Sequence, residues 1–208
     1  MKKLFLLLAA ILSLQCAMAQ NVDVFVKGGI GMSNYVGDDT ESTDVKCAYK
    51  FGVGLDVPLK NIWKFETGLY LNGWGAKEKA SAYGVSVTAT AKPLYLELPI
   101  MAKAAFPLSD KFNMSIAAGP YLALGVGGKL TASAEYQGVS GDDSIDLFGD
   151  VEDNNAGMKR FDMGLGVNFN FEVKRIIFGL DTRFGLTKVY EDTKAHNISA
   201  LFVVGYRF

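Results

Sequence analysis

The side chains best suited to chemistry fall into two groups: a lone histidine near the C-terminus and a run of carboxylates in the second half of the chain. His196 is the single histidine, and the nearest serine after it, Ser199, stands three positions away. A serine nucleophile needs a histidine within hydrogen-bonding reach, and in a strand residues three apart point to opposite faces. This spacing disfavours a serine hydrolase, so we expect no catalytic residues and place His196 at the start of a strand.

The carboxylates lie in residues 140–155, which read SGDDSIDLFGDVEDNN. Clustered carboxylates can bind Ca²⁺, and six fall in this segment: Asp142, Asp143, Asp146, Asp150, Glu152 and Asp153. The calcium-loop pattern fails, because Asn155 stands where a glycine is required if Asp150 is the first ligand. We therefore expect a solvated acidic loop, with a divalent-cation site as the alternative. We expect no cofactor and no other metal site.

Alternation of apolar and polar residues is the main structural signal in the chain. The clearest run is 161–173, where every odd position is apolar and every even position is Asp, Gly, Asn or Glu. Such period-2 alternation predicts β-strands. The same pattern predicts eight strands near residues 22–34, 46–58, 62–74, 89–106, 111–126, 160–174, 175–188 and 197–208.

The connections between these strands alternate in length. Short turns near 58–61, 107–110 and 174–175 alternate with longer polar segments at 35–45, 75–88, 127–159 and 189–196. This arrangement predicts an all-β fold, an eight-stranded antiparallel up-and-down barrel.

The segment LYLELPIMAKAAF at 94–106 indicates which face of the barrel is inside. Its leucines alternate with Glu97, Pro99 and Lys103, and elsewhere the polar face is rich in glycine with isolated charges. That composition suits a narrow lumen better than a solvated surface, and the strands are long enough to cross a bilayer. We therefore expect a transmembrane barrel with its apolar face toward lipid. A soluble, lipocalin-like periplasmic carrier is the alternative. Pro99 predicts a local bulge or twist.

The same alternation places six basic and six acidic side chains in the lumen. They are Lys27, Lys50, Lys64, Lys103, Arg183 and Arg207, with Asp56, Glu66, Glu97, Asp162, Glu172 and Asp181. Side chains fill a barrel of eight strands, and buried charges must be paired. We therefore predict a structural ion-pair network that closes the lumen. A proton or ion path through these groups is the alternative.

The N-terminus has the features of a secretory signal peptide over residues 1–19. Lys2 and Lys3 precede an apolar stretch from Leu4 to Leu14, and Ala17-Met18-Ala19 fits a cleavage site. Lipidation of Cys16 is an alternative that Gln15 disfavours. We expect one mature domain, the barrel at 20–208, in which Cys47 would be the remaining cysteine.

Charge and aromatic placement indicate the partners. Loss of Lys2 and Lys3 leaves 19 basic and 22 acidic residues, a formal charge of −3, and no basic patch suggests nucleic acid. We expect contact with outer-membrane lipids and lipopolysaccharide through aromatic girdles. One girdle comprises Trp63, Phe65, Phe106, Phe112, Phe171, Tyr206 and Phe208, and the other comprises Tyr49, Trp74 and Phe161. The terminal strand, with Tyr206 and Phe208, looks like the signal read by the outer-membrane assembly machinery.

Five segments carry a family resemblance: YLELP at 95–99, AGPY at 118–121, FDMG at 161–164, GLD at 179–181 and GYRF at 205–208. They resemble the PorT-like outer-membrane β-barrels of Bacteroidota, over nearly the whole mature chain. The resemblance implies an integral outer-membrane barrel, exported through the periplasm, and a weak link to secretion or envelope assembly with an unidentified protein partner. We expect a non-enzymatic structural or surface-interaction role through the long extracellular segments. An enzyme modifying lipid A or phospholipid is the alternative.

Overall fold

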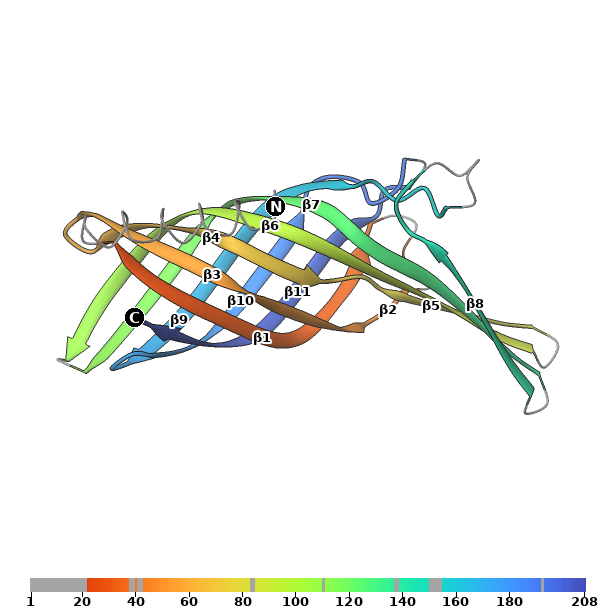
Figure 1. Cartoon of the computed structure of the whole chain (residues 1–208), viewed down its shortest axis with the longest axis horizontal. Helices are drawn as coiled ribbons and strands as arrows, with labels where there is room; N and C mark the ends of the chain where they lie inside the picture. Colours follow the sequence, from red (N-terminus) through yellow and green to blue (C-terminus); the bar gives the residue numbers. More distant parts are fainter. Residues whose placement is uncertain are drawn as a thin grey trace, which may run out of the picture.

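The computed structural model describes residues 22–37, 40, 43–82, 85–109, 111–136, 139–149, 155–191 and 193–208. The signal peptide predicted at 1–19 and the carboxylates Asp150, Glu152 and Asp153 lie outside the described residues. The described residues form one antiparallel sheet of eleven strands (Figure 1). They contain no helix long and apolar enough to cross a membrane.

Eight long strands of this sheet close into a ring. These are β1 (Asp23–Val36), β3 (Lys46–Lys60), β4 (Trp63–Gly73), β6 (Val85–Ser109), β7 (Phe112–Tyr136), β9 (Phe161–Val173), β10 (Ile176–Gly185) and β11 (His196–Arg207). Each pairs with the next along the chain, and β11 pairs with β1 to close the cylinder. The predicted eight-stranded up-and-down barrel is therefore confirmed.

Tight turns connect strands at one end of the barrel. Asn61 and Lys174, the non-glycine residues with positive φ in the described chain, adopt φ angles of 55° and 57° in the turns after β3 and β9. Such left-handed residues allow two-residue hairpins whose twist matches that of the strands. Outer-membrane barrels have short periplasmic turns and longer extracellular segments, so this end faces the periplasm.

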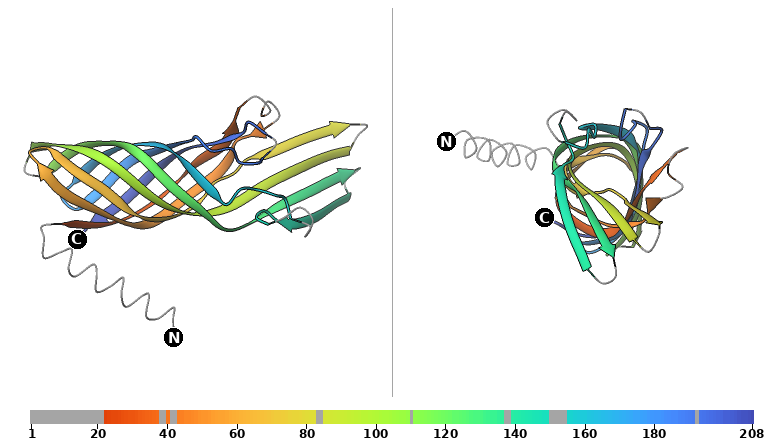
Figure 2. Two further views of the ribbon diagram at one scale, coloured as in Figure 1. Left: turned by 90° about the horizontal axis from the view of Figure 1, so that it is seen from above. Right: turned by 90° about the vertical axis from the view of Figure 1, so that its right-hand side faces the viewer.

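The opposite end extends well beyond the ring. Strands β6 and β7 are 25 residues long, and their outer parts pair with β5 (Lys77–Ala82) and β8 (Val139–Asp146). The short β2 (Thr43–Asp44) adds to the edge of β5. We call β5, residues 85–92 of β6, residues 129–136 of β7 and β8 the protruding sheet; Figure 2 shows it projecting from the barrel.

The expectation that 75–88 and 127–159 are loops was therefore wrong for much of both segments. Residues 85–88, Val-Ser-Val-Thr, continue the alternation of the strand predicted from residue 89, and their β-branched side chains favour strands. The long hairpins supply these residues with paired neighbours along their length.

The two faces of the barrel have opposite chemistry, as predicted. Outward side chains include Phe202, Ile30 and Phe51, which are 76%, 70% and 64% exposed, whereas Glu97 and Asp56 inside are fully buried. A continuous exposed apolar surface of this kind requires an apolar partner. In a closed barrel the hydrocarbon of a bilayer is that partner.

The predicted girdles are found with one correction. Trp63, Phe171, Tyr206 and Phe208 are exposed on the outer surface near the tight-turn end, and Tyr49 and Phe161 are exposed nearer the other end. The remaining girdle candidates Phe65, Phe106 and Phe112 are partly exposed. Trp74 does not belong to a girdle: it is 1% exposed and packs inside against Tyr95 and Tyr121, with ring centroids 5.2 and 5.7 Å away. Its position continues the inward series of β4, which explains the error.

The region around Pro99 interrupts the sheet without a bulge. The β4–β6 pairing skips Gly68 and Leu69, yet the register on either side is the same. The register of β6 against β7 shifts elsewhere, between Leu94 and Tyr95 and between Pro107 and Ser109. Pro99 lacks the amide proton that the ladder requires, and its carbonyl accepts a hydrogen bond from the Thr67 hydroxyl at 2.7 Å. The β4–β6 register does not shift at Pro99, so the predicted bulge was wrong there, and the local twist that was its alternative stays a prediction.

Candidate functional site

All twelve charged residues expected in the lumen lie on its inner face. Nine are almost completely buried: Lys27, Lys50, Asp56, Glu66, Glu97, Lys103, Asp162, Asp181 and Arg183. Lys64, Glu172 and Arg207 are half-buried at the periplasmic mouth. The alternation that forms the strands therefore also positions the ionic groups, since every second side chain points toward the axis.

Glu97 on β6 is the central acceptor of the network. Arg183 on β10 donates to it from Nε and Nη2 at 2.9 and 2.8 Å, and Lys50 on β3 donates at 3.2 Å. Asn72 on β4 also donates to the carboxylate. Four strands are thus joined through one buried carboxylate whose charge is fully compensated.

A second layer lies toward the periplasm. Lys27 on β1 lies 3.5 Å from Asp181 and 3.8 Å from Glu66. Lys103 donates to Glu66 at 2.9 Å and to Asp56 at 2.8 Å. Because Lys50 also contacts Asp181 at 3.3 Å, the two layers form one connected set of charges.

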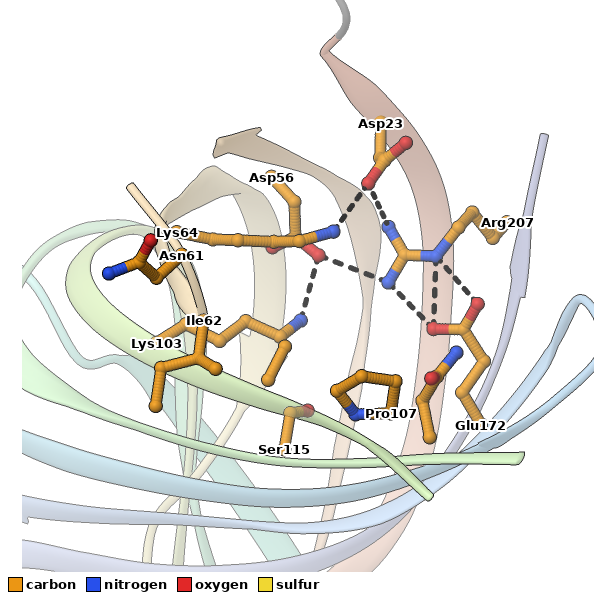
Figure 3. Close-up of a pocket in the computed structure, with 12 residues that line it drawn as sticks. Asp23, Asp56, Asn61, Ile62, Lys64, Lys103, Pro107, Ser115, Glu172 and Arg207 are labelled. Carbon is orange, nitrogen blue, oxygen red and sulfur yellow. Dashed lines mark hydrogen bonds and ion pairs between the residues drawn. The ribbon is translucent and has the colours of Figure 1, made fainter. Parts of the chain in front are cut away.

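The periplasmic mouth is organised around Arg207 (Figure 3). Its guanidinium lies 2.8 Å from Glu172, 3.0 Å from Asp56 and 3.5 Å from Asp23, and Lys64 lies 2.7 Å from Asp23. These side chains line a cavity of ≈ 380 Å³. Asp23 was not among the predicted members, although it shares the face of Lys27 at the start of the first predicted strand.

Asp162 departs from the predicted ion-pair network. No ion pair joins it to a described residue; instead Tyr121 and Asn197 donate to it at 3.1 and 3.0 Å, and the Thr187 hydroxyl donates as well. It lies toward the extracellular end, where neutral donors replace cations. Sequence reasoning missed Tyr121 and Asn197, whose inward positions on their strands were the available signal.

Charge balance explains how the lumen tolerates so many ions. The connected buried set contains four cations, Lys27, Lys50, Lys103 and Arg183, and four anions, Asp56, Glu66, Glu97 and Asp181. An uncompensated buried charge costs several kcal/mol. The arrangement is that of a neutral, cross-linked filling of the barrel.

The acidic segment does not converge on a point. Asp142 and Asp143 are exposed neighbours on β8 and point to opposite faces, and Asp146 is exposed further along the strand. In the described part of the chain, no group of three or more His, Cys, Asp or Glu residues could hold a metal ion. With the other three carboxylates outside the described residues, cation binding by this segment stays a prediction.

His196 is not arranged to activate a serine. Its Nδ1 lies 3.0 Å from the carbonyl oxygen of Thr187, to which it can only donate. Ser199 is buried on the inner face, 4% exposed. The geometry offers no histidine–serine pair at this position.

The extracellular mouth holds a smaller pocket of ≈ 130 Å³ between the barrel rim and the base of the protruding sheet. Tyr35, Ala91, Leu130 and Tyr190 contribute to its lining. Burial raises the pKa of the Tyr190 hydroxyl, and the nearby charge of Glu78 raises it further. The tyrosine is therefore neutral at physiological pH.

The C-terminal residues close the barrel. The Phe208 amide donates to the Val24 carbonyl at 3.0 Å, and the rings of Tyr206 and Phe208 lie 5.4 Å apart on the outer surface. Recognition of these two aromatic residues by an assembly machinery stays a prediction.

A closed antiparallel barrel with an apolar exterior and an ionic interior defines an outer-membrane β-barrel protein. The chain belongs to the family described as Outer membrane protein beta-barrel domain, which matches residues 18–191. Its location is therefore the outer membrane.

Several solved outer-membrane barrels are similar in fold. Ail of Yersinia pestis is 12% identical, with 89% of this chain and 98% of that chain covered and a TM-score of 0.40. Neisserial surface protein A is 12% identical, with 89% and 97% covered and a TM-score of 0.44. The N-terminal β-barrel domain of Pseudomonas aeruginosa OprF is 11% identical, with 91% and 98% covered and a TM-score of 0.39. No curated protein matches the sequence.

Proposed function

We propose that this protein is a non-enzymatic outer-membrane barrel that holds the protruding sheet outside the cell as a surface for a protein partner. The observation that carries the proposal is the continuity of β6 and β7, which run from the membrane wall into the protruding sheet as single 25-residue strands. The wall thus serves as the base of the extracellular structure.

The surface of the protruding sheet has two distinct faces. Register pairs Ala89 with Ala132 on one face, and Thr88 with Ser133 on the other. Ala132 is exposed and Ala89 is partly exposed, so the protruding sheet presents a face of small side chains and a polar face outside the membrane. The ion-filled lumen supports the same proposal, since it leaves the extracellular part of the chain to carry the activity.

The proposal includes a finer assignment of the protein to the PorT-like barrels of Bacteroidota. With that assignment comes a role in a secretion or envelope assembly. It rests on the five motifs quoted from the sequence. A lipid-modifying enzyme is the less favoured alternative, because His196 is engaged with a backbone carbonyl. Substitution His196→Ala should leave the lipid A profile unchanged in mass spectrometry, and loss of a modification would favour the enzyme.

Shortened hairpins test the proposal. Lys79 pairs with Thr88, and Ser133 pairs with Asp142, so each hairpin can be closed at these pairs with an Asn-Gly turn that preserves the register. The variant lacking 80–87 and 134–141 should still insert as a heat-modifiable barrel.

A photo-reactive residue reports the partner directly. At Ala132 of the full-length protein it should give a protein adduct on intact cells, and at the lipid-facing Phe202 it should give none. The shortened variant, with the probe again at Ala132, should lose the adduct. Identical adducts at Ala132 and Phe202, or none at Ala132, would contradict the proposal.

A further inference from the structure

Three lysines mark the extracellular limit of the lipid-facing surface on neighbouring strands. On β6 the outward apolar series Ile100, Leu98, Leu96 and Leu94 ends at Lys92, and on β7 the series containing Leu124 and Val126 ends at Lys129. Lys77, at the start of β5, follows the outward Leu71 of β4. These positions fall where the hydrocarbon of the outer leaflet gives way to its headgroups.

The register places the three lysines next to one another on one face of the sheet. Lys92 and Lys129 are directly opposite on β6 and β7, and Lys77 pairs with Thr90, two residues from Lys92 on the same face. Directly opposed side chains have Cβ atoms about 5 Å apart, and diagonal ones about 7–8 Å. Like charges so placed repel one another and destabilise the sheet, unless an anion lies between them.

Few carboxylates of the protein neutralise the charge of these lysines. None of Lys77, Lys92 and Lys129 makes an ion pair with another residue in the described ranges, whereas the neighbouring Asp44 is engaged by Lys79 at 3.0 Å. Asp146 lies opposite Lys129 in the register of β7 and β8. Asp44 lies opposite Lys77 in the register of β2 and β5, so, with Lys79 included, two carboxylates face four lysines and the cluster stays positive.

A groove lies on the lipid-facing surface below this cluster. It has a volume of ≈ 500 Å³ and crosses β3, β4 and β6, where Phe51, Val53, Leu71, Leu96 and Leu98 contribute to an almost wholly apolar lining. It includes Gly68 and Leu69, the two residues that the β4–β6 pairing skips beside Pro99. The interruption in the sheet and the groove thus coincide.

The spacing of groove and lysines fits one amphipathic molecule. Leu96 at the upper part of the groove lies four strand residues after Lys92, about 13 Å at a rise of about 3.3 Å per residue. We propose that the groove and the lysine cluster form a binding site for a phosphorylated lipid of the outer leaflet, with one acyl chain in the groove and a phosphate between Lys92 and Lys129. This site does not depend on the protein partner proposed above.

Charge complementarity favours a lipid phosphate over other occupants. A basic residue near a membrane surface contributes about 1 kcal/mol to the binding of anionic lipid, and the groove lies within the apolar band, which free phosphate does not reach. A second copy of this chain would bring the same lysines into repulsion. A phosphorylated lipid would occupy both parts of the site, the apolar groove and the lysine cluster.

Lipid retention measured by native mass spectrometry tests the proposal. Wild-type barrel is loaded with bis-phosphorylated lipid A in mixed micelles and washed with neutral detergent. The K92Q/K129Q variant should retain about 30-fold less lipid, as expected from two lysines. Leu98→Trp, which fills the groove while remaining apolar, should also reduce retention, and Asp146→Asn should increase it.

Matched controls separate this site from general attraction. Lys188 follows the outward Leu186 after β10, across the ring from β6, so Lys188→Gln should leave retention unchanged, as should Phe202→Trp. Dephosphorylated lipid A should be lost on washing, and millimolar inorganic phosphate should not displace the intact lipid.

Several results of these measurements would overturn the proposed lipid site. Equal loss in K92Q/K129Q and Lys188→Gln would overturn the site, as would full retention in Leu98→Trp or displacement by inorganic phosphate. Heat-modifiability on gels confirms that each variant is folded, and the gain expected for Asp146→Asn cannot arise from misfolding.

Discussion

Glu97 and Arg183 face each other across the lumen from β6 and β10, strands that are not neighbours in the ring, and two hydrogen bonds of 2.9 and 2.8 Å join them. Both side chains are almost completely buried, at 0% and 3% exposure. The pair links the walls of the barrel through its centre, where backbone ladders cannot reach.

Breaking this pair should destabilise the barrel strongly. Glu97→Leu leaves Arg183 buried without its carboxylate, and we expect a loss of about 3–5 kcal/mol in the free energy of unfolding. Urea titration in detergent micelles measures the loss. The exposed pair Lys79–Asp44 is the control, since Asp44→Ala should cost less than about 1 kcal/mol. A small effect at Glu97 would contradict a tightly paired lumen.

Asp162 should respond differently from Glu97. Because neutral donors hold Asp162, Asp162→Asn leaves no buried cation unpaired. The asparagine carbonyl still accepts hydrogen bonds, so we expect to lose about the contribution of one bond to a charged group, about 1.5–3 kcal/mol. The same urea titration should therefore show a smaller loss than for Glu97→Leu. An equal or larger loss would indicate that a cation compensates Asp162 in solution.

The two tryptophans provide a direct test of orientation. Trp63 is 51% exposed on the outer surface, whereas Trp74 is buried in the lumen. In bilayers containing brominated lipid, fluorescence of the Trp74→Phe protein should be strongly quenched and that of the Trp63→Phe protein largely preserved. The reverse pattern would place the apolar faces inside the barrel.

Arg207 should matter for closure of the cylinder. Its guanidinium contacts Asp23 of the first strand while lying on the last, and it also contacts Asp56 and Glu172. Arg207→Gln should slow folding into detergent and lower the melting temperature, with Arg207→Lys intermediate because an ammonium lacks the bidentate fork. Arg175→Gln, at an exposed turn arginine bonded to Tyr206, should have little effect on either quantity.

The filled lumen should not conduct. In planar bilayers the wild-type protein should give no stable single-channel step, because paired side chains occupy the barrel along its axis. A channel-forming barrel inserted under the same conditions is the control. A steady conductance would contradict the filled lumen and support the ion-path alternative.

Much of this architecture could be predicted from alternation, because a period of two fixes both the strand and the direction of each side chain. It placed Lys103 and Asp181 on the inner face without knowledge of the register. The particular partners could not be predicted: the contact between Glu97 and Arg183 depends on the stagger of strands around the ring, which no local pattern records. The protruding sheet was missed for another reason: residues 85–91 alternate, but their apolar members are only Val and Ala, so the hydrophobic contrast between the two faces is weak. Long-range pairing with the neighbouring strands holds them extended.

The uninterrupted length of β6 and β7 has a mechanical consequence. About 9–11 residues of each strand suffice to cross the bilayer, so the outer parts of the two 25-residue strands, residues 85–92 and 129–136, stand clear of it as direct continuations of the wall. The end of the protruding sheet is therefore held at a constant height above the cell surface. A pulling force on it is transmitted directly to the hydrogen-bonded strands of the barrel, and no flexible loop lies between to absorb it.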